Sequence, residues 1–122
     1  MKVRIGVAAG PGVVDDGPAF FDLVDALDEL GYDSIWVPDV ITTPTVDPIA
    51  ALAVAAGRRS RLKIGTHLIL PGRNPVLLAK QLATLDRLSD GRLLLLAVLG
   101  LRQDAELAAQ GVRAVDRPSM LE

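Results

Sequence analysis

The sequence predicts an α/β fold made of four consecutive strand–helix units with parallel strands. Short apolar segments begin near residues 3, 34, 63 and 93, and a helical pattern follows each of the first three. The spacing of about thirty residues is the length of one such unit. Each apolar segment is almost continuously hydrophobic, which is typical of parallel strands that are covered on both faces.

The first unit is expected to comprise a strand at Val3–Ala8, a glycine-rich loop at Gly10–Pro18 and a helix from about Ala19 to Leu30. Apolar residues recur at helical spacing, so they should form one buried stripe, while acidic residues point outward. Gly31 can adopt the left-handed conformation that closes this helix. The stripe consists of Phe20, Leu23, Val24, Leu27 and Leu30, and the outward residues are Asp22, Asp25, Asp28 and Glu29.

The second unit is expected to begin with a strand at Ser34–Val37 and a loop at Pro38–Val46. Asp47–Pro48 predicts a helix start, because Asp caps free amide groups and Pro has no amide hydrogen to satisfy in the first turn. This Ala-rich helix should run to about Ala56 and end at Gly57. A solvated turn is then expected at the arginines Arg58, Arg59 and Arg61.

The third and fourth units repeat the same signals. A strand is expected at Leu62–Leu70, and Asn74–Pro75 starts a helix that extends to about Leu88, with leucines at spacings of four and three. The fourth strand is expected at Arg92–Leu99. A short helix at about Asp104–Gln110 should follow it within the next loop.

Two architectures fit this order of elements: a segment of a (β/α)₈ barrel and an open, doubly wound sheet. The spacing of the units does not separate them. The chain has 122 residues, so we expect one domain over residues 1–122. A complete barrel typically takes about 250 residues. We therefore expect four units, with the chain stopping at Glu122, where the main fourth helix would begin.

Composition excludes several classes of function. The net charge is −2 with no basic stripe, which argues against nucleic-acid binding. The lack of Cys excludes disulfides and thiolate metal ligands and suits the cytoplasm. The longest apolar run, Leu93–Leu99, is too short for a membrane span, which needs about 20 residues, so no membrane contact is expected. Arg4 interrupts the N-terminal apolar segment, which favours a strand over a secretion signal.

Ligands of parallel α/β folds bind at the carboxyl ends of the strands, so polar residues there are candidates. Asp39 directly follows the second strand and could accept a hydrogen bond or a proton, or could be an ordinary turn residue. His67, the single histidine, could be a general acid or base, or a hydrogen-bonded residue without a role. A lone His without Cys argues against a transition-metal site. The first loop matches neither the dinucleotide fingerprint nor a phosphate loop.

Four segments together resemble the luciferase-like monooxygenase superfamily. They are GYDSIWVPD at 31–39, DPIAALAVAA at 47–56, LKIGTHLILPGRNPVLLAKQLATLDRLSDGRL at 62–93 and GLRQDAEL at 100–107. The third is the most specific, with a Gly-Thr strand end, a Pro, an Arg-x-Pro helix start and a Leu-Ser-x-Gly-Arg turn. The matching residues are Gly65, Thr66, Pro71, Arg73, Pro75, Ala79, Lys80, Ala83, Thr84, Leu85, Asp86, Leu88, Ser89, Gly91 and Arg92.

The resemblance implies the N-terminal half of a (β/α)₈ TIM barrel of the bacterial luciferase type. It implies a flavin- or deazaflavin-dependent oxidoreductase or monooxygenase, in which flavin mononucleotide or the deazaflavin coenzyme binds at the barrel mouth with a small-molecule substrate. Asp39 then matches the family's Asp near the coenzyme ring, and Thr66 and His67 match a third-strand bulge against which the ring packs. Leu99 and Gly100 match the strand end that lines the coenzyme pocket. Asp39 and His67 are the catalytic candidates.

The chain departs from the family pattern at three positions. Val40 replaces the His that follows the Asp in many deazaflavin members, and Leu96 and Val98 replace glycines of the fourth strand. Branched side chains take the room that glycine leaves for a ligand, so the pocket could be narrowed. Two hypotheses follow. The chain is an oxidoreductase whose barrel is completed as a homodimer or by a second chain, or it is a non-catalytic half-barrel remnant or subunit that acts only as a dimerising, structural partner.

Overall fold

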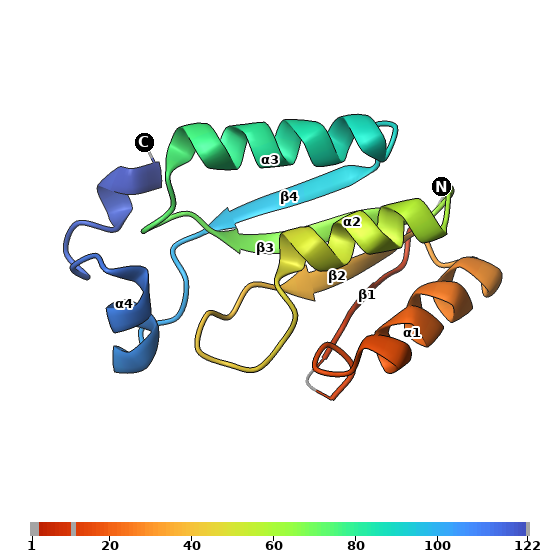
Figure 1. The fold of residues 1–122 in the computed structure, drawn as a ribbon, viewed down its shortest axis with the longest axis horizontal. Helices are drawn as coiled ribbons and strands as arrows, with labels where there is room; N and C mark the ends of the chain where they lie inside the picture. The colour runs from red at the N-terminus through yellow and green to blue at the C-terminus, as the bar shows by residue number, and fades with distance from the viewer. Residues whose placement is uncertain (1–2, 11, 122) are drawn as a thin grey trace.

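The computed structural model describes residues 3–10 and 12–121 and contains the expected alternation of strands and helices (Figure 1). Pro11, within the expected first loop, and Glu122, where the fourth main helix was expected, lie outside the described residues. The elements are β1 (Gly6–Ala8), α1 (Gly17–Glu29), β2 (Ser34–Pro38), α2 (Pro48–Arg58), β3 (Lys63–Ile69), α3 (Pro75–Leu88), β4 (Leu93–Val98), α4 (Asp104–Gln110) and a 3₁₀ helix at Pro118–Leu121.

The strands form one parallel sheet in the order β1-β2-β3-β4. Each strand pairs with the next strand along the chain, so the order never reverses. A doubly wound sheet would reverse its order at a switch point and carry helices on both faces. The sequential order is that of a barrel segment, and it resolves the choice that unit spacing left open.

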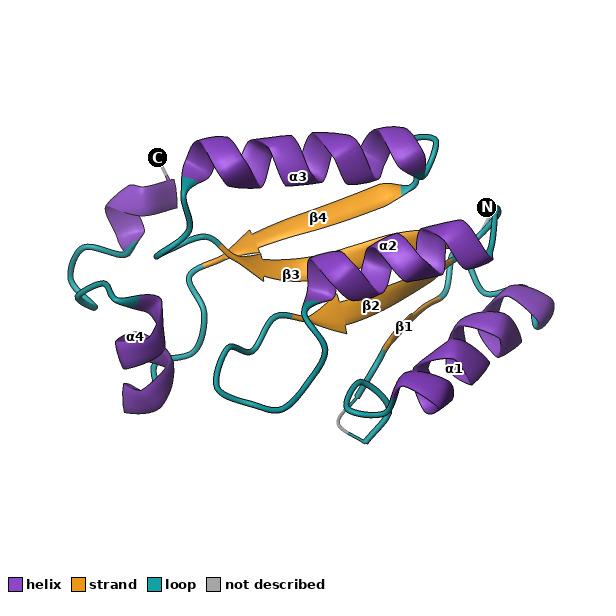
Figure 2. Cartoon of the chain, viewed as in Figure 1, coloured by secondary structure: helices purple, strands orange, loops and turns teal. Residues whose placement is uncertain are grey.

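Helices α1, α2 and α3 cover one face of the sheet and pack side by side along it (Figure 2). The core lies between this layer and the sheet, where Ile35, Val37 and Ile64 of the strands meet Val24 and Leu52 of the helices. Each of these side chains is fully buried. The helix starts predicted at Asp47 and Asn74 are confirmed, since their side chains accept hydrogen bonds from Ala50 N and Leu77 N at 3.0 Å.

The opposite side of the sheet, which we call the open face, carries no helix in the part of the chain that the structure describes. Side chains alternate along a strand and residues in register share a face, so Gly6, Trp36, Gly65, His67 and Leu96 all lie on it. The Trp36 indole lies flat over Gly65, where a Cβ would come within 2.7 Å of the ring. Glycine at this position is therefore required for the indole to lie against the backbone.

Several boundaries of the first three units differ from the sequence prediction. The first strand begins at Gly6 instead of Val3, and the first helix begins at Gly17 instead of about Ala19. The first helix ends at Glu29 and leaves Leu30 as its cap, 74% exposed, so Leu30 is not part of the buried stripe. Gly31 has φ +81° and closes the helix as predicted. Gly57 does not end the second helix, which continues to Arg58.

The arginines at the end of α2 and in the turn after it are solvated, as predicted, and they also pair with α1. Arg58 and Arg59 both pair with Asp25 of α1, at 2.5 and 2.8 Å, so this carboxylate faces the arginine cluster at the surface. Arg61 pairs with Asp28 at 3.3 Å and donates to the Tyr32 carbonyl. Hydrogen bonds from Arg58, then from Arg59, lower the pKa of Asp25 from 3.8 to about 2. The cluster ties α1 to the end of α2.

A further arginine, Arg92, connects three of the strand–helix units through hydrogen bonds to backbone carbonyls. The Arg92 guanidinium donates to the carbonyls of Ala56, Arg59 and Leu62, at 2.9, 2.8 and 2.7 Å, and also to Ser89. These carbonyls belong to the end of α2, the turn after it and the start of β3. Arg92 itself precedes β4, so one side chain fixes the amino ends of two neighbouring strands.

The pKa of Asp25 predicts how stability depends on pH. A carboxyl whose pKa is lower in the folded than in the unfolded chain stabilises the fold above its ordinary value of 3.8. That contribution is lost as the pH falls through about 2. The melting temperature of the wild type should be higher than that of Asp25→Asn at pH 5, and the two melting temperatures should converge as the pH falls toward 2. Asp15→Asn, an exposed loop carboxylate, is the control. A difference in melting temperature that stays constant with pH would contradict a stabilising role of these ion pairs.

Candidate functional site

The carboxyl ends of the strands meet at one edge of the sheet, together with the β2–α2 loop, the β3–α3 loop and α4 (Figure 1). Parallel strands produce this arrangement because all of them run in the same direction. Asp39, His67 and Gly100 follow or end β2, β3 and β4, so the fold brings these predicted site residues to the same edge.

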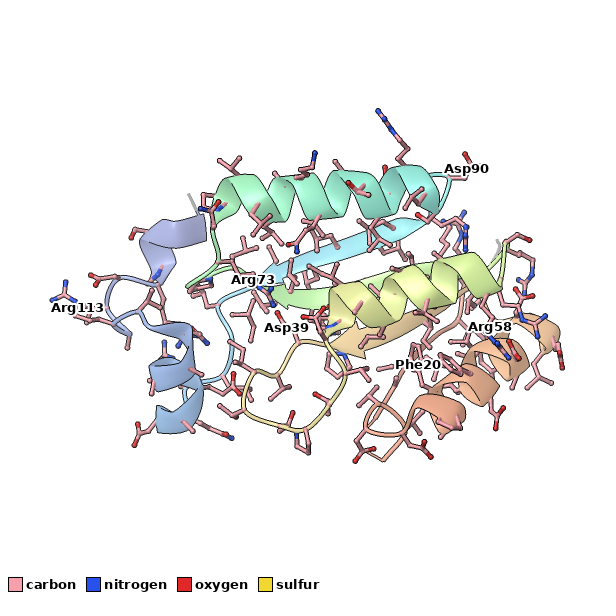
Figure 3. The ribbon with its side chains drawn as sticks, viewed as in Figure 1. Phe20, Asp39, Arg58, Arg73, Asp90 and Arg113 are labelled. Atoms are coloured by element: carbon pink, nitrogen blue, oxygen red, sulfur yellow. The ribbon has the colours of Figure 1, made fainter. Side chains whose placement is uncertain are left out.

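Asp39 is buried and its carboxylate joins the ends of two strands. Its Oδ2 accepts a hydrogen bond from Ile69 N at 2.9 Å and from Arg73 Nη2 at 2.8 Å. Arg73 also donates through Nε to the Ile69 carbonyl at 2.9 Å. Figure 3 shows Asp39 and Arg73 side by side at this edge. Among the described residues no hydrogen bond reaches Oδ1, so this oxygen can accept one from a ligand.

His67 lies on the open face and is exposed. Its imidazole stacks on the Trp36 indole, with ring centroids 5.2 Å apart and an interplanar angle of 24°. The indole is held in turn by a hydrogen bond from Nε1 to Ser34 Oγ at 3.2 Å. The stack forms a flat aromatic surface, and Trp36 is a part of it that sequence reasoning missed. Its alternation with buried Ile35 and Val37 was the available signal.

Thr66 does not share a site with His67. It points to the helix-covered face, is fully buried, and its Oγ1 has no hydrogen-bond partner among the described residues. The pairing of β3 with β2 and β4 is in unbroken register from Ile64 to His67, so the bulge that would turn both residues toward a ligand is not present. The open face therefore exposes His67 and not Thr66.

Leu99 and Gly100 are engaged by the segment that follows them. Their carbonyls accept hydrogen bonds from the buried guanidinium of Arg117. Gly100 has φ +85°, and a Cβ there would lie 2.7 Å from Nε2 of Gln110. Leu96 is in register with His67, so its side chain occupies the open face as the departure from the glycine pattern predicted.

A cleft of about 360 Å³ lies beside this edge, between the β2–α2 loop and the end of α4. Asp39 and Arg73 line it together with Thr43, Gly72 and Gln110. The cleft exists because of the position of α4. The sequence analysis predicted this helix correctly at Asp104–Gln110 but did not predict which element it contacts.

The partner of α4 is the β2–α2 loop, through Glu106. This carboxylate is fully buried and accepts hydrogen bonds from the amide and hydroxyl of Thr42 and from the amide of Ile41. Burial acts to raise the pKa of Glu106, but the hydrogen bonds outweigh it and hold the pKa below its usual value of 4.5. Glu106 is therefore ionised at neutral pH. No local pattern in the sequence marked Glu106, because its partners lie 64 and 65 residues away in the chain.

Within the described residues, no group of three or more His, Cys, Asp or Glu could hold a metal ion. No helix in the same part of the chain is long and apolar enough to cross a membrane.

Comparison with protein families gives a match over residues 2–121 to the family described as luciferase-like monooxygenase. Limonene 1,2-monooxygenase of Rhodococcus erythropolis is 32% identical, over 99% of this chain and 34% of that protein. An uncharacterised protein of Mycobacterium tuberculosis is 38% identical, over 70% of this chain and 30% of that protein. The chain thus spans about a third of the length of the curated relatives it matches.

Solved structures share the fold. A monooxygenase of Streptomyces bottropensis superposes with a TM-score of 0.82 and 26% identity, over 97% of this chain and 39% of that one. The coenzyme F420-dependent tetrahydromethanopterin reductase of Methanopyrus kandleri superposes with a TM-score of 0.74 and 25% identity, over 93% of this chain and 31% of that one. The oxygenating constituent of a Pseudomonas putida diketocamphane monooxygenase, in complex with FMN, superposes with a TM-score of 0.83 and 19% identity, over 98% of this chain and 37% of that one.

The contacts of Asp39 predict a structural cost for its replacement. Asp39→Asn removes the charge that pairs with Arg73 and should lower the free energy of unfolding by about 1.5–3 kcal/mol, the range for hydrogen bonds to charged groups. Urea denaturation measures the change. Asp104→Asn, an exposed carboxylate of α4, is the control and should have little effect. Equal midpoints for both variants would show that the pair contributes nothing to stability.

Proposed function

The chain belongs to the luciferase-like monooxygenase family, and from this membership we propose that it supplies one wall of the coenzyme pocket of a flavin- or deazaflavin-dependent oxidoreductase. The observation that carries the proposal is the stacked pair of Trp36 and His67 on the open face, next to the edge where Asp39 lies. Flat aromatic surfaces bind planar ring systems by offset stacking. A flavin or deazaflavin ring is planar, so the stack suits either.

The coenzyme class rests on the relatives. The Methanopyrus kandleri reductase depends on coenzyme F420, and the Pseudomonas putida enzyme is in complex with FMN. We therefore propose that flavin mononucleotide or a deazaflavin occupies the open face at its carboxyl edge. His67 would orient the ring by stacking and by hydrogen bonding, and Oδ1 of Asp39 would accept a hydrogen bond from a ring amide. The coenzyme would supply the redox chemistry for a small-molecule substrate.

The pocket also needs a second wall. Among residues 3–10 and 12–121, nothing covers the open face and no strand pairs with the outer edge of β4. Leu96 on that face is 48% exposed. On the other face, an apolar groove of about 670 Å³ runs between α3 and β4, lined by Leu78, Leu82 and Leu95. In a barrel the helix after β4 would fill this groove. We propose that further strand–helix units, from a second copy or a second chain, cover these surfaces.

A second candidate is a non-catalytic half-barrel that serves only as a dimerising, structural partner. Leu96 and Val98 favour it, since their side chains lie on the same face as His67 and reduce the space over β4. The two candidates differ in whether the protein binds a coenzyme.

Coenzyme binding can be read from Trp36, the single tryptophan of the chain. Titration with FMN or a deazaflavin should quench its fluorescence, and His67→Ala should weaken binding about 3- to 10-fold, because one stacked ring is lost. Thr66→Val, on the opposite face, should leave affinity unchanged. Gln81→Ala on exposed α3 is the control for His67→Ala. Absence of quenching with either coenzyme would favour the structural candidate, and an effect of Thr66→Val alone would refute the open-face site.

Association can be measured by sedimentation velocity. The purified chain should form a dimer or larger assembly, because it exposes a strand edge and an apolar sheet face. Leu96→Arg on the open face and Leu95→Arg in the groove should shift the equilibrium toward monomer. Leu88→Arg, at a site 75% exposed on the end of α3, is the control. A stable monomer at micromolar concentration would contradict the requirement for a second wall.

A further inference from the structure

The β2–α2 loop, residues 39–47, has few anchors to the rest of the chain. Residues 41–44 are exposed, and the loop rejoins the core only at its ends. At one end Asp39 is held by Ile69 and Arg73, and at the other Val46 N donates to the Val14 carbonyl at 2.7 Å. The middle of the loop would be free to move if nothing else held it.

Helix α4 supplies that missing anchor. Figure 2 shows it beyond the arrowheads of the strands, beside the β2–α2 loop. Glu106 Oε1 accepts hydrogen bonds from the Thr42 amide at 2.8 Å and from the Thr42 hydroxyl, and Oε2 accepts one from Ile41 N at 3.4 Å. The partners are 64 and 65 residues apart in the chain. A fully buried carboxylate with three donors is a strong, specific contact.

The other contacts of α4 are of a different kind. Its last residue, Gln110, packs on Gly72 and Gly100, and a Cβ on Gly72 would come within 2.2 Å of the Gln110 carbonyl oxygen. The Gln110 amide itself has no hydrogen-bond partner among the described residues. These contacts set where α4 lies against the segments that follow β3 and β4 but do not reach the β2–α2 loop. Glu106 therefore provides the polar contact between helix and loop.

Both elements that Glu106 joins are walls of the same cleft. Val40, Ile41 and Thr43 line it from the loop, and Ala109 and Gln110 line it from the helix. The distance between the two walls therefore depends on the Glu106 contact. Since Asp39 begins the loop, a movement of the loop also changes the access to Asp39 Oδ1.

We propose that Glu106 is a positioning residue that holds the β2–α2 loop against α4 and thereby sets the width of the cleft beside Asp39. Glu106 touches no reacting group in this arrangement and acts through Ile41 and Thr42. The proposal rests on the proposed function only for its effect on coenzyme affinity, because the loop contact itself needs no coenzyme.

Hydrogen exchange of the full chain, followed by mass spectrometry or NMR, tests the contact without a ligand. In Glu106→Gln the amides of Ile41 and Thr42, which donate to this carboxylate, should exchange at least about 10-fold faster, as expected when hydrogen bonds to a charged group are lost. Amides of β3 at residues 64–68 should keep their protection. Asp104→Asn on the same helix is the control. Equal loop protection in the wild type and Glu106→Gln would overturn the proposal.

A second pair of variants keeps the test valid if Glu106→Gln unfolds. Thr42→Ser retains the hydroxyl and the amide and should preserve loop protection, whereas Thr42→Val loses the hydroxyl and should raise exchange in the loop alone. A loss of protection that extends equally to β3 in Thr42→Val would show a merely structural role and refute positioning.

An FMN titration then separates this proposal from the proposed function. If the wild type binds FMN, Glu106→Gln should weaken binding several-fold at unchanged β3 protection, and unchanged affinity would overturn the effect on the cleft. If neither protein binds FMN or a deazaflavin, the coenzyme proposal fails for this chain, while faster loop exchange in Glu106→Gln still supports the positioning role.

Discussion

All of the crossover helices between the parallel strands lie on one face of the sheet, and the rest of the structure depends on this constraint. The covered face carries the core, in which Ile35, Val37 and Ile64 meet the helices. The open face is left with the stacked rings of Trp36 and His67, which no helix covers in the described residues. Because all of these helices lie on one face, the strands follow one another in chain order, and this order distinguishes a barrel segment from an open sheet.

The second consequence of parallel strands is the crowded carboxyl edge. Loops from separate units meet there, and two buried carboxylates organise them. Asp39 fixes the end of β3 through Ile69 and Arg73, and Glu106 fixes the loop after β2. Each carboxylate receives donors from elements distant in the chain, so each loop is positioned by another unit and not by its own.

Local signals predicted the elements well and the directions of side chains less well. The caps at Asp47 and Asn74 depend on neighbouring residues only, and both were confirmed. The face to which Thr66 points depends on the register of β3, which a single chain segment does not define. Glu106 pairs with a loop 64 residues away, and such a contact leaves no local pattern. The family resemblance was confirmed over residues 2–121, whereas the roles it implied for single residues stay predictions.

Arg92 has a consequence for how the chain folds. Its guanidinium binds carbonyls of Ala56, Arg59 and Leu62, between 30 and 36 residues earlier in the chain. None of these bonds can form until the end of α2 and the start of β3 have met the turn before β4. The second, third and fourth units are thus coupled, so they should gain their final structure cooperatively and not as independent repeats that fold one after another.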